Sequence, residues 1–498
     1  MTDRTTGKLT RRTLLGFLMY GVADRALAGA PDGSLRPQPR PVRVAQKSTS
    51  GAHAARIKKA NLSGRISYAV ADARTGEMLE TYKPLVSHPP ASVLKAITAL
   101  YGLETLGPGH RFRTRLVADG TLVNGVLQGD LVLVGGGDPS LDTDDLFDMA
   151  ARLKELGLRE VKGRFLVYDA ALPRVERIDD IQPEHVGYNP AVAGLNLNYN
   201  RIYLEWKRSG DDYAVTLDAR SGARRPTVDV SQISVVDRSG PVFDYENDAG
   251  IDRWSVARRS LGREGGRWLP VRAPGVYTGE VFRDLSRSHG IVLDAPEMVP
   301  GPPRNGKLLI EHVSDDLTDI CRKMLKFSTN LTAEIIGLSA TRSRGAAVSD
   351  LAESGEEMSE WLRQRFGLSK ARFVDHSGLG GGSRLSVQET VKCLVGAGPH
   401  GTLRGLLKTY PVSGKNEDGA LRVEAKTGTL NFVSGLAGYV QTRSGRDLAF
   451  AIYAADIPRR DALRPEDRER PSGGRAWSRR ARTLQRDLIA AWAETYDS

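Results

Sequence analysis

The stretch Pro90-Ala91-Ser92-Val93-Leu94-Lys95 is the part of this 498-residue chain that says most about its fold. Apolar residues follow at the three- and four-residue spacing of a helix with one buried face. They are Val93, Leu94, Ile97, Leu100, Tyr101 and Leu103. Ser92 therefore lies in the first helical turn. Lys95 can reach its hydroxyl, because residues three apart on a helix are neighbours.

A serine and a lysine at this spacing have the chemistry of a nucleophile and its base. A serine hydroxyl is a weak nucleophile until a base removes its proton, and a neutral lysine amine can be that base. An ordinary lysine, with a pKa of about 10.4, is about 3 units too basic for this at neutral pH. Burial, the helix N-terminus and a second cation would lower the pKa of Lys95. The alternative is a helix-start serine beside a solvated lysine, since about one S-x-x-K arises by chance in a chain of this length.

A second motif, Lys426-Thr427-Gly428-Thr429, is much rarer by chance. It ends a stretch from residue 421 in which apolar and charged residues alternate, which predicts a half-buried strand. Two more strands are predicted over 436–440 and 448–454, joined by the hairpin-like Arg443-Ser444-Gly445-Arg446. At the edge of such a sheet, threonines and a lysine can bind a carboxylate, a backbone N–H can stabilise an oxyanion, and Gly428 lets substrate approach closely. A polar strand end before a turn is the alternative.

The third motif, Ser328-Thr329-Asn330, follows a helical pattern over 317–325. Taken alone, it is typical of a helix C-terminus with Asn330 as the terminating residue. In a serine acyl-transfer site, Ser328 would relay a proton toward the leaving group, and Asn330 would orient Lys95 and a substrate amide. The three motifs occur once each, in the order S-x-x-K, S-x-N and K-T-G, and their combination predicts such a site.

Four further strings make the chain similar to a known family. They are Gly129-Asp130-Leu131, Gly135-Gly136-Gly137-Asp138-Pro139-Ser140-Leu141, Asn196-Leu197-Asn198-Tyr199-Asn200 and Asp375-His376-Ser377-Gly378-Leu379. Over about residues 60 to 495, the sequence resembles the D-alanyl-D-alanine carboxypeptidase/endopeptidases of the class C low-molecular-mass penicillin-binding proteins, the penicillin-binding protein 4 (DacB) type. Two residues depart from the family pattern. Thr329 stands where the family commonly has an acidic residue, and His376 stands where it usually has glycine. His376 would be strained if the loop requires a positive φ.

The resemblance implies a serine-type D-Ala-D-Ala carboxypeptidase that acts on peptidoglycan stem peptides through an acyl-enzyme on Ser92 and is acylated by penicillins. The implied catalytic residues are Ser92, Lys95, Ser328, Asn330 and Lys426. The implied substrate-binding residues are Thr427, Gly428, Thr429, Asp375 and Ser377, although a turn rich in Asp, Ser and Gly equally explains the last two. A weakly catalytic peptidoglycan-binding or β-lactam-sensing scaffold, and a slow β-lactamase, stay open as alternatives.

The spacing of the motifs predicts the domain organisation. Ser92 and Ser328 are 236 residues apart, whereas Ser328 and Lys426 are only 98 apart. We therefore expect an α+β fold with a discontinuous serine β-lactamase-like catalytic domain, an antiparallel sheet with helices, over 61–108 and 305–498. A large strand-rich insertion over 109–304 interrupts it. No Glu-x-x-Leu-Asn string lies between Asn330 and Lys426, so efficient penicillin hydrolysis is not expected.

The N-terminus predicts export. Thr10-Arg11-Arg12-Thr13-Leu14-Leu15 precedes an apolar run and Ala26-Leu27-Ala28, which resembles a twin-arginine signal over 1–28, followed by a linker over 29–60. The protein is therefore expected in the periplasm without an integral membrane segment. Removing the signal, with its five basic and two acidic residues, lowers the formal charge from +11 to +8. This surplus of positive charge suits the binding of acidic peptide stems and gives no indication that the protein binds nucleic acid.

The remaining sequence features bear on the core and on cofactors. Cys321 and Cys393 both lie in helical apolar patterns, so we expect two buried free thiols. Neither metal-ligand spacing nor a nucleotide-binding glycine motif occurs, and no cofactor is expected. A hairpin is predicted over 66–70 and 78–82 and a helix over 145–156. The closing helix presents one apolar face, formed by Trp477, Ala481, Leu484, Leu488 and Trp492.

Overall fold

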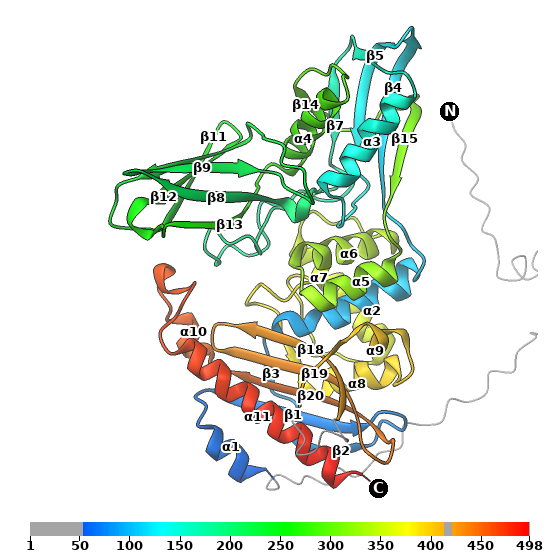
Figure 1. Ribbon diagram of the computed structural model, residues 1–498. Coiled ribbons are helices and arrows are strands. Elements are labelled where there is room, and N and C mark those ends of the chain that lie inside the picture. The colour runs from blue at the N-terminus through cyan, green and yellow to red at the C-terminus, as the bar shows by residue number, and fades with distance from the viewer. Residues whose placement is uncertain (1–52, 413–420, 498) are drawn as a thin grey trace, which may run out of the picture. The chain divides into compact units, whose positions relative to one another are not determined.

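The computed structural model of the protein describes residues 53–412 and 421–497 (Figure 1). The predicted export signal and most of the predicted linker lie outside these residues. The last residues of that predicted linker form a helix, α1 (Ala54–Ala60), whose Ile57 and Ala60 pack against the core. In the described ranges, none of the helices combines the length and the apolar composition needed to cross a bilayer.

A six-stranded antiparallel sheet forms the centre of the catalytic part. Its strands run in the order β17-β18-β19-β20-β1-β2, so the first two strands of the chain join the last four. Their bounds are β17 (Lys408–Thr409), β18 (Arg422–Leu430), β19 (Val433–Gln441), β20 (Asp447–Ala455), β1 (Arg65–Asp72) and β2 (Met78–Tyr82). The three strands predicted after residue 421 and the predicted hairpin of β1 and β2 are confirmed.

The two faces of this sheet are covered by different helices. Successive residues of a strand point to opposite faces; Tyr68 and Val70 therefore share one apolar cluster and Ala69 and Ala71 another. On the first face lies the closing helix, α11 (Gly474–Thr495), as Figure 1 shows in red. All five of its predicted face residues are buried, which confirms the helix prediction.

The second face packs against a layer of helices that carries two of the three motifs. Their bounds are η1 (Ala91–Val93), α2 (Leu94–Leu106), α5 (Leu317–Phe327), α6 (Asn330–Ser343), α7 (Leu351–Phe366), α8 (Val387–Ala397) and α9 (Thr402–Leu406). The short strands β3 (Ser87–His88) and β16 (Leu385–Ser386) pair beside them. Cys321 on α5 and Cys393 on α8 are buried free thiols in this layer, as predicted. Burial raises the pKa of the Cys321 thiol to about 12.

Between α2 and α5 the chain builds further sheets around a separate apolar core. One sheet has the order β14-β7-β5-β4-β15, with β6 beside β5; the others are β13-β8-β9 and β10-β12-β11. Helices α3 (Thr143–Glu155) and α4 (Pro274–Ser288) pack in this core. The strands are β4 (Arg113–Val123), β5 (Val126–Val134), β6 (Glu160–Val161), β7 (Phe165–Tyr168), β8 (Arg201–Ser209), β9 (Asp212–Asp218), β10 (Ser231–Val236), β11 (Phe243–Asp248), β12 (Ile251–Ala257), β13 (Glu264–Pro270), β14 (Pro296–Met298) and β15 (Lys307–Val313).

The last of these strands lies beyond the residue at which the insertion was predicted to end. β15 pairs antiparallel with β4, and Val313 faces Arg113 at the start of β4. The chain thus enters and leaves this sheet at neighbouring positions, and the sheet continues past residue 304. The domain boundaries stay a prediction, but the mixed α+β class with a strand-rich insertion is confirmed.

Candidate active site

Ser92 lies in a tight turn at the start of the nucleophile helix. The 3-10 turn η1 holds it, and α2 begins two residues later. Ala91, directly before it, is buried and has a φ of 47°, a left-handed conformation that costs energy for a residue with a Cβ. Ser92 is half-buried and lines a groove of about 1080 Å³. The turn thus exposes the hydroxyl to the groove at the expense of local backbone strain.

Lys95 is entirely shielded from solvent and points at the Ser92 hydroxyl. Its Nζ lies 3.0 Å from Ser92 Oγ, and it donates hydrogen bonds to Asn330 Oδ1 and to the Ser377 carbonyl, each at 2.7 Å. Burial lowers the pKa of Lys95 to about 8, although the negative charges of Glu334 and Asp375 oppose this shift. A base of this strength is neutral for a useful fraction of the time near neutral pH.

The second motif spans the junction of α5 and α6. α5 ends at Phe327, and Ser328 caps it in a left-handed conformation with a φ of 60°. Asn330 is the first residue of α6, so the interpretation of Asn330 as a helix-terminating residue is wrong. Its side-chain amide also donates to the Tyr188 carbonyl at 2.8 Å, which ties the insertion to the site. The Thr329 hydroxyl bonds to Thr332 in the first turn of α6.

The K-T-G-T motif lies at the end of β18, as predicted, with Leu430 as the only strand residue after it. Lys426 is buried, and its Nζ donates to Ser328 Oγ and to the Thr427 carbonyl, each at 2.9 Å. Burial, and then the charge of Lys95, lower the pKa of Lys426 well below its ordinary value. Two amines and two hydroxyls therefore form one cluster beside the groove.

Gly428 brings the strand against the nucleophile turn. A Cβ at this position would lie 2.6 Å from the Pro90 carbonyl oxygen and 3.1 Å from the Ala91 Cβ. The glycine was predicted to let substrate approach, and the structure shows a close approach between two parts of the protein instead. Thr429 is exposed and lines the groove, whereas Thr427 is exposed on the strand but is not among the lining residues.

Asp375 and Ser377 lie beneath the groove and not on its wall. Both are buried, and Gly378 and Leu379 line the groove in their place. The Asp375 carboxylate accepts hydrogen bonds from the backbone of Gly378 and Gly380, at 2.9 and 2.7 Å. Burial, followed by the charge of Glu334, raises the pKa of Asp375 to about 7. This placement gives no support to the predicted substrate contact; it makes the two residues parts of the loop that holds Lys95.

Glu334 is the site residue that sequence reasoning missed. Its carboxylate accepts hydrogen bonds from the backbone N–H groups of His376 and Ser377, each at 2.9 Å, and lies 3.2 Å from His376 Nδ1. Burial raises the pKa of Glu334, but these bonds outweigh burial and hold the pKa below its ordinary value. Its position four residues after Asn330, on the same face of α6, was an available signal.

His376 is not strained, contrary to the possibility raised by its family departure. The described residues with positive φ include Gly378 but not His376. The imidazole instead fills the space beside Gly337, where a Cβ would overlap the ring. Its Nε2 lies 3.1 Å from Ser354 Oγ, so both ring nitrogens have partners. In the residues that the structure describes, no group of three acidic, histidine or cysteine side chains could hold a metal ion.

Comparison with known proteins agrees with this geometry. The family model described as D-Ala-D-Ala carboxypeptidase 3 (S13) matches residues 51–471. A D-alanyl-D-alanine carboxypeptidase from Actinomadura sp. (strain R39) is 28% identical over 422 residues, which cover 78% of each chain. D-alanyl-D-alanine carboxypeptidase DacB from Haemophilus influenzae is 25% identical, over 73% of this chain and 79% of the relative.

Solved structures show the same fold. Penicillin-binding protein 4 (dacB) from Haemophilus influenzae aligns with a TM-score of 0.69 at 20% identity, over 87% of this chain and 99% of that structure. Its complex with a β-lactam aligns with a TM-score of 0.67, also at 20% identity, over 88% of this chain and 99% of that structure. The serine–lysine cluster, the sheet and the family match lead to one conclusion: the chain belongs to the D-Ala-D-Ala carboxypeptidase 3 (S13) family of serine carboxypeptidases.

Proposed function

We propose that this protein removes the terminal D-alanine of peptidoglycan stem peptides by a two-step acyl transfer in which Ser92 is the nucleophile. The observation that carries this proposal is the 3.0 Å separation between Lys95 Nζ and Ser92 Oγ beside a groove that Ser328, Asn330 and Thr429 also line. A proton can pass directly between two atoms at that distance.

In the first step neutral Lys95 takes the proton of Ser92, and Oγ forms a bond to the carbonyl carbon between the two D-alanines. The backbone N–H groups of Ser92 and Thr429 hold the oxyanion, a contribution of about 3 kcal/mol for each donor. When the C–N bond breaks, the departing amine takes a proton from the cluster of Lys95, Ser328 and Lys426. The 2.9 Å contact between Lys426 and Ser328 supports this relay.

In the second step water attacks the ester carbonyl on Ser92 and Lys95 takes its proton. The bond between the carbonyl carbon and Ser92 Oγ then breaks, Oγ takes that proton from Lys95, and the shortened peptide leaves as a carboxylic acid. Lys426, Thr427 and Thr429 bind the terminal carboxylate of the substrate during the first step. A penicillin acylates the same serine. Endopeptidase activity on cross-linked stems would form and break the same kinds of bond at Ser92, with a longer leaving group in the groove.

The first test uses a fluorescent penicillin and a D-Ala-D-Ala pentapeptide. We expect one adduct per chain on Ser92, mapped by mass spectrometry, together with release of D-alanine; Ser92→Ala should lose both. Ser343, which is exposed at the last position of α6, provides the matched Ser→Ala control and should keep both. A labelled Ser92→Ala protein would contradict the assignment. An adduct without D-alanine release would favour the scaffold or sensor, and rapid nitrocefin turnover the β-lactamase.

The protein is proposed to act in the periplasm after export by the twin-arginine signal. Support comes only from the sequence of residues 1–28 and from the nature of the proposed substrate, a cell-wall polymer. A fusion of these residues to a reporter, compared with an Arg11→Lys/Arg12→Lys variant, tests the export. Retention of the wild-type fusion in the cytoplasm would contradict it.

A further inference from the structure

Arg272 is a buried side chain of the insertion that no step of the proposed mechanism uses. It lies between β13 and α4, and only 2% of it is exposed. Its backbone N–H donates to the carboxylate of Asp252 at 2.9 Å, and Asp252 is itself buried on β12. The Tyr245 hydroxyl donates to the same carboxylate at 2.9 Å. The core of the insertion thus fixes the main chain from which this guanidinium projects.

The guanidinium of Arg272 binds the backbone of one loop at three points. Nη1 donates to the carbonyls of Glu176 and Asn189, at 3.0 and 2.8 Å, and Nη2 donates to the carbonyl of Glu184 at 2.9 Å. Residues 176–189, called the 176–189 loop below, contain no helix or strand. Backbone carbonyls that are removed from water need a donor, and the rigid fork of an arginine can supply several donors at once. One side chain therefore joins both ends of this loop.

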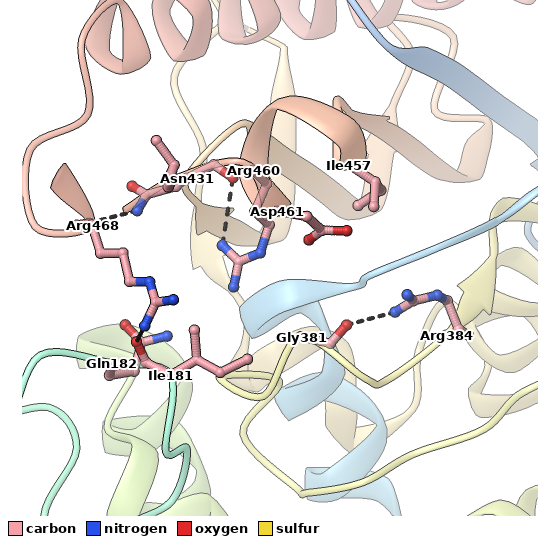
Figure 2. Close-up of a pocket in the computed structure, with 10 residues that line it drawn as sticks. Ile181, Gln182, Gly381, Arg384, Asn431, Ile457, Arg460, Asp461 and Arg468 are labelled. Atoms are coloured by element: carbon pink, nitrogen blue, oxygen red, sulfur yellow. Dashed lines mark hydrogen bonds between the residues drawn. The ribbon is translucent and has the colours of Figure 1, made fainter. Parts of the chain in front are cut away.

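On its outer side the 176–189 loop borders open space. Ile181 and Gln182 line a cavity of about 310 Å³, and the half-buried Arg468 donates to the Ile181 carbonyl at 3.0 Å (Figure 2). Because a cavity lies on this side, the position of the loop depends on hydrogen bonds more than on side-chain packing. Inside the loop, the buried Asn189 is a second support, since its side-chain oxygen accepts two backbone N–H groups of the loop, at 2.9 and 3.0 Å.

The loop contacts the active site through a main-chain atom. The Tyr188 carbonyl accepts a hydrogen bond from the side-chain N–H of Asn330 at 2.8 Å, and Asn330 Oδ1 accepts one from Lys95 at 2.7 Å. A carbonyl accepts but does not donate, so it selects the amide orientation in which the NH2 group faces the loop and the oxygen faces the lysine. The carbonyl of the next residue, Asn189, is the one that Arg272 binds at 2.8 Å. Arg272 thus acts on the chain directly beside this contact.

We infer that Arg272 is a positioning residue for the acylation reaction. It holds the 176–189 loop in place, and the Tyr188 carbonyl then keeps the Asn330 amide oxygen directed at Lys95. A small displacement of such a contact slows a reaction strongly, because proton transfer requires the participating atoms to lie within hydrogen-bond reach. The insertion therefore takes part in catalysis through its backbone. This inference rests on the proposed acyl transfer.

A double-mutant cycle on the rate of penicillin acylation tests this inference. In the otherwise wild-type chain, Arg272→Met should lower the second-order rate constant by about tenfold, because the loop and Asn330 lose their fixed positions. In an Asn330→Ala chain, the same change should lower the constant by less than about twofold, because the contact through which Arg272 acts is already absent. Equal fold losses in the two backgrounds, or no loss in either, would overturn the inference.

Two further variants separate this effect from a general loss of structure. Asn189→Ala removes the second support of the loop but keeps the charge of Arg272, and its effect on acylation should depend on Asn330 in the same way. Arg220 lies in the same insertion, and its guanidinium binds the carboxylates of Asp218 and Glu205. Arg220→Met is therefore the matched control and should leave acylation unchanged. A loss in Arg220→Met as large as in Arg272→Met would contradict the assignment.

Hydrogen–deuterium exchange distinguishes a failure of this inference from a failure of the proposed function. In Arg272→Met the backbone amides of the 176–189 loop should exchange faster than in the wild type, whether or not Ser92 reacts. If the wild type forms no penicillin adduct but the loop of the variant exchanges faster, the acyl-transfer proposal fails and the support of the loop by Arg272 stands. If the loop exchanges faster but both proteins are acylated at the same rate, the positioning inference fails alone.

Discussion

Glu334 and His376 form a buried contact directly behind the catalytic lysine: the Glu334 carboxylate accepts the His376 backbone N–H at 2.9 Å, and neither side chain is exposed. The same carboxylate holds the N–H of Ser377, whose carbonyl accepts a hydrogen bond from Lys95. One buried charge thus fixes the loop that positions the base and, by its sign, favours the protonated form of that base. Glu334 is therefore a positioning residue whose negative charge also disfavours the neutral form of Lys95.

Penicillin acylation should depend on pH through Lys95. Its neutral form is the base, and with a pKa of about 8 only about one tenth is neutral at pH 7. The second-order acylation rate should therefore rise about tenfold per pH unit below 8 and level off above it. Stopped-flow acylation between pH 5.5 and 9.5 measures this. A rate that is flat over pH 6 to 8 would exclude Lys95 as a base with this pKa.

Replacing Glu334 by glutamine should act on both the loop and the base. The variant loses charge-assisted hydrogen bonds to two backbone N–H groups, so we expect the free energy of unfolding to fall by about 2 kcal/mol. Because the charge of Glu334 raises the pKa of Lys95, its removal should move the pH–rate midpoint to lower pH. Urea unfolding and the pH profile measure the two effects. Glu356→Gln, exposed on α7, should change neither.

A midpoint that stays in place in Glu334→Gln would mean that Glu334 only supports the loop. A rise of the midpoint would contradict the electrostatic argument altogether, since no negative charge is gained.

Replacing Asn330 by aspartate should shift the pKa of Lys95 in the opposite direction, upward. Asn330→Asp places a carboxylate at the position of the amide oxygen, 2.7 Å from Lys95 Nζ, and an opposite charge this close stabilises the ammonium form. Acylation at pH 7 should fall by about 100-fold and recover in part above pH 9. Asn330→Ala, which removes the acceptor without adding charge, should slow acylation without an alkaline shift. The same midpoint in both variants would contradict this reasoning.

Gly337 and His376 should be coupled through the volume they share. A methyl group on Gly337 would overlap the imidazole, so Gly337→Ala should destabilise the fold by about 1–3 kcal/mol. In a His376→Gly background the same change should cost nothing, which a double-mutant cycle measures. Gly405→Ala on α9, where a Cβ meets no atom within 4 Å, is the matched control. Equal costs of Gly337→Ala in both backgrounds would show that the ring does not occupy that space.

Several elements could be predicted from the sequence because their causes are local. The contact of Ser92 with Lys95 follows from helical spacing, the strands around Lys426 follow from alternation, and the apolar face of α11 follows from a 3.6-residue period. The order of the three motifs also predicted the active site. The exact end of β18 could not be predicted from alternation alone, because pairing with β19 carries this strand one residue past the motif, to Leu430.

What the sequence by itself determined is the chemistry: a nucleophile, a base beside it and the family of the chain, all encoded in residues that are near neighbours or fixed strings. Only the tertiary structure decided that Lys426 bonds to Ser328, 98 positions away, that Asn330 contacts Tyr188, and that Asp375 and Ser377 lie below the groove. These contacts depend on which faces of distant elements are buried together, and no local pattern of residues carries that information.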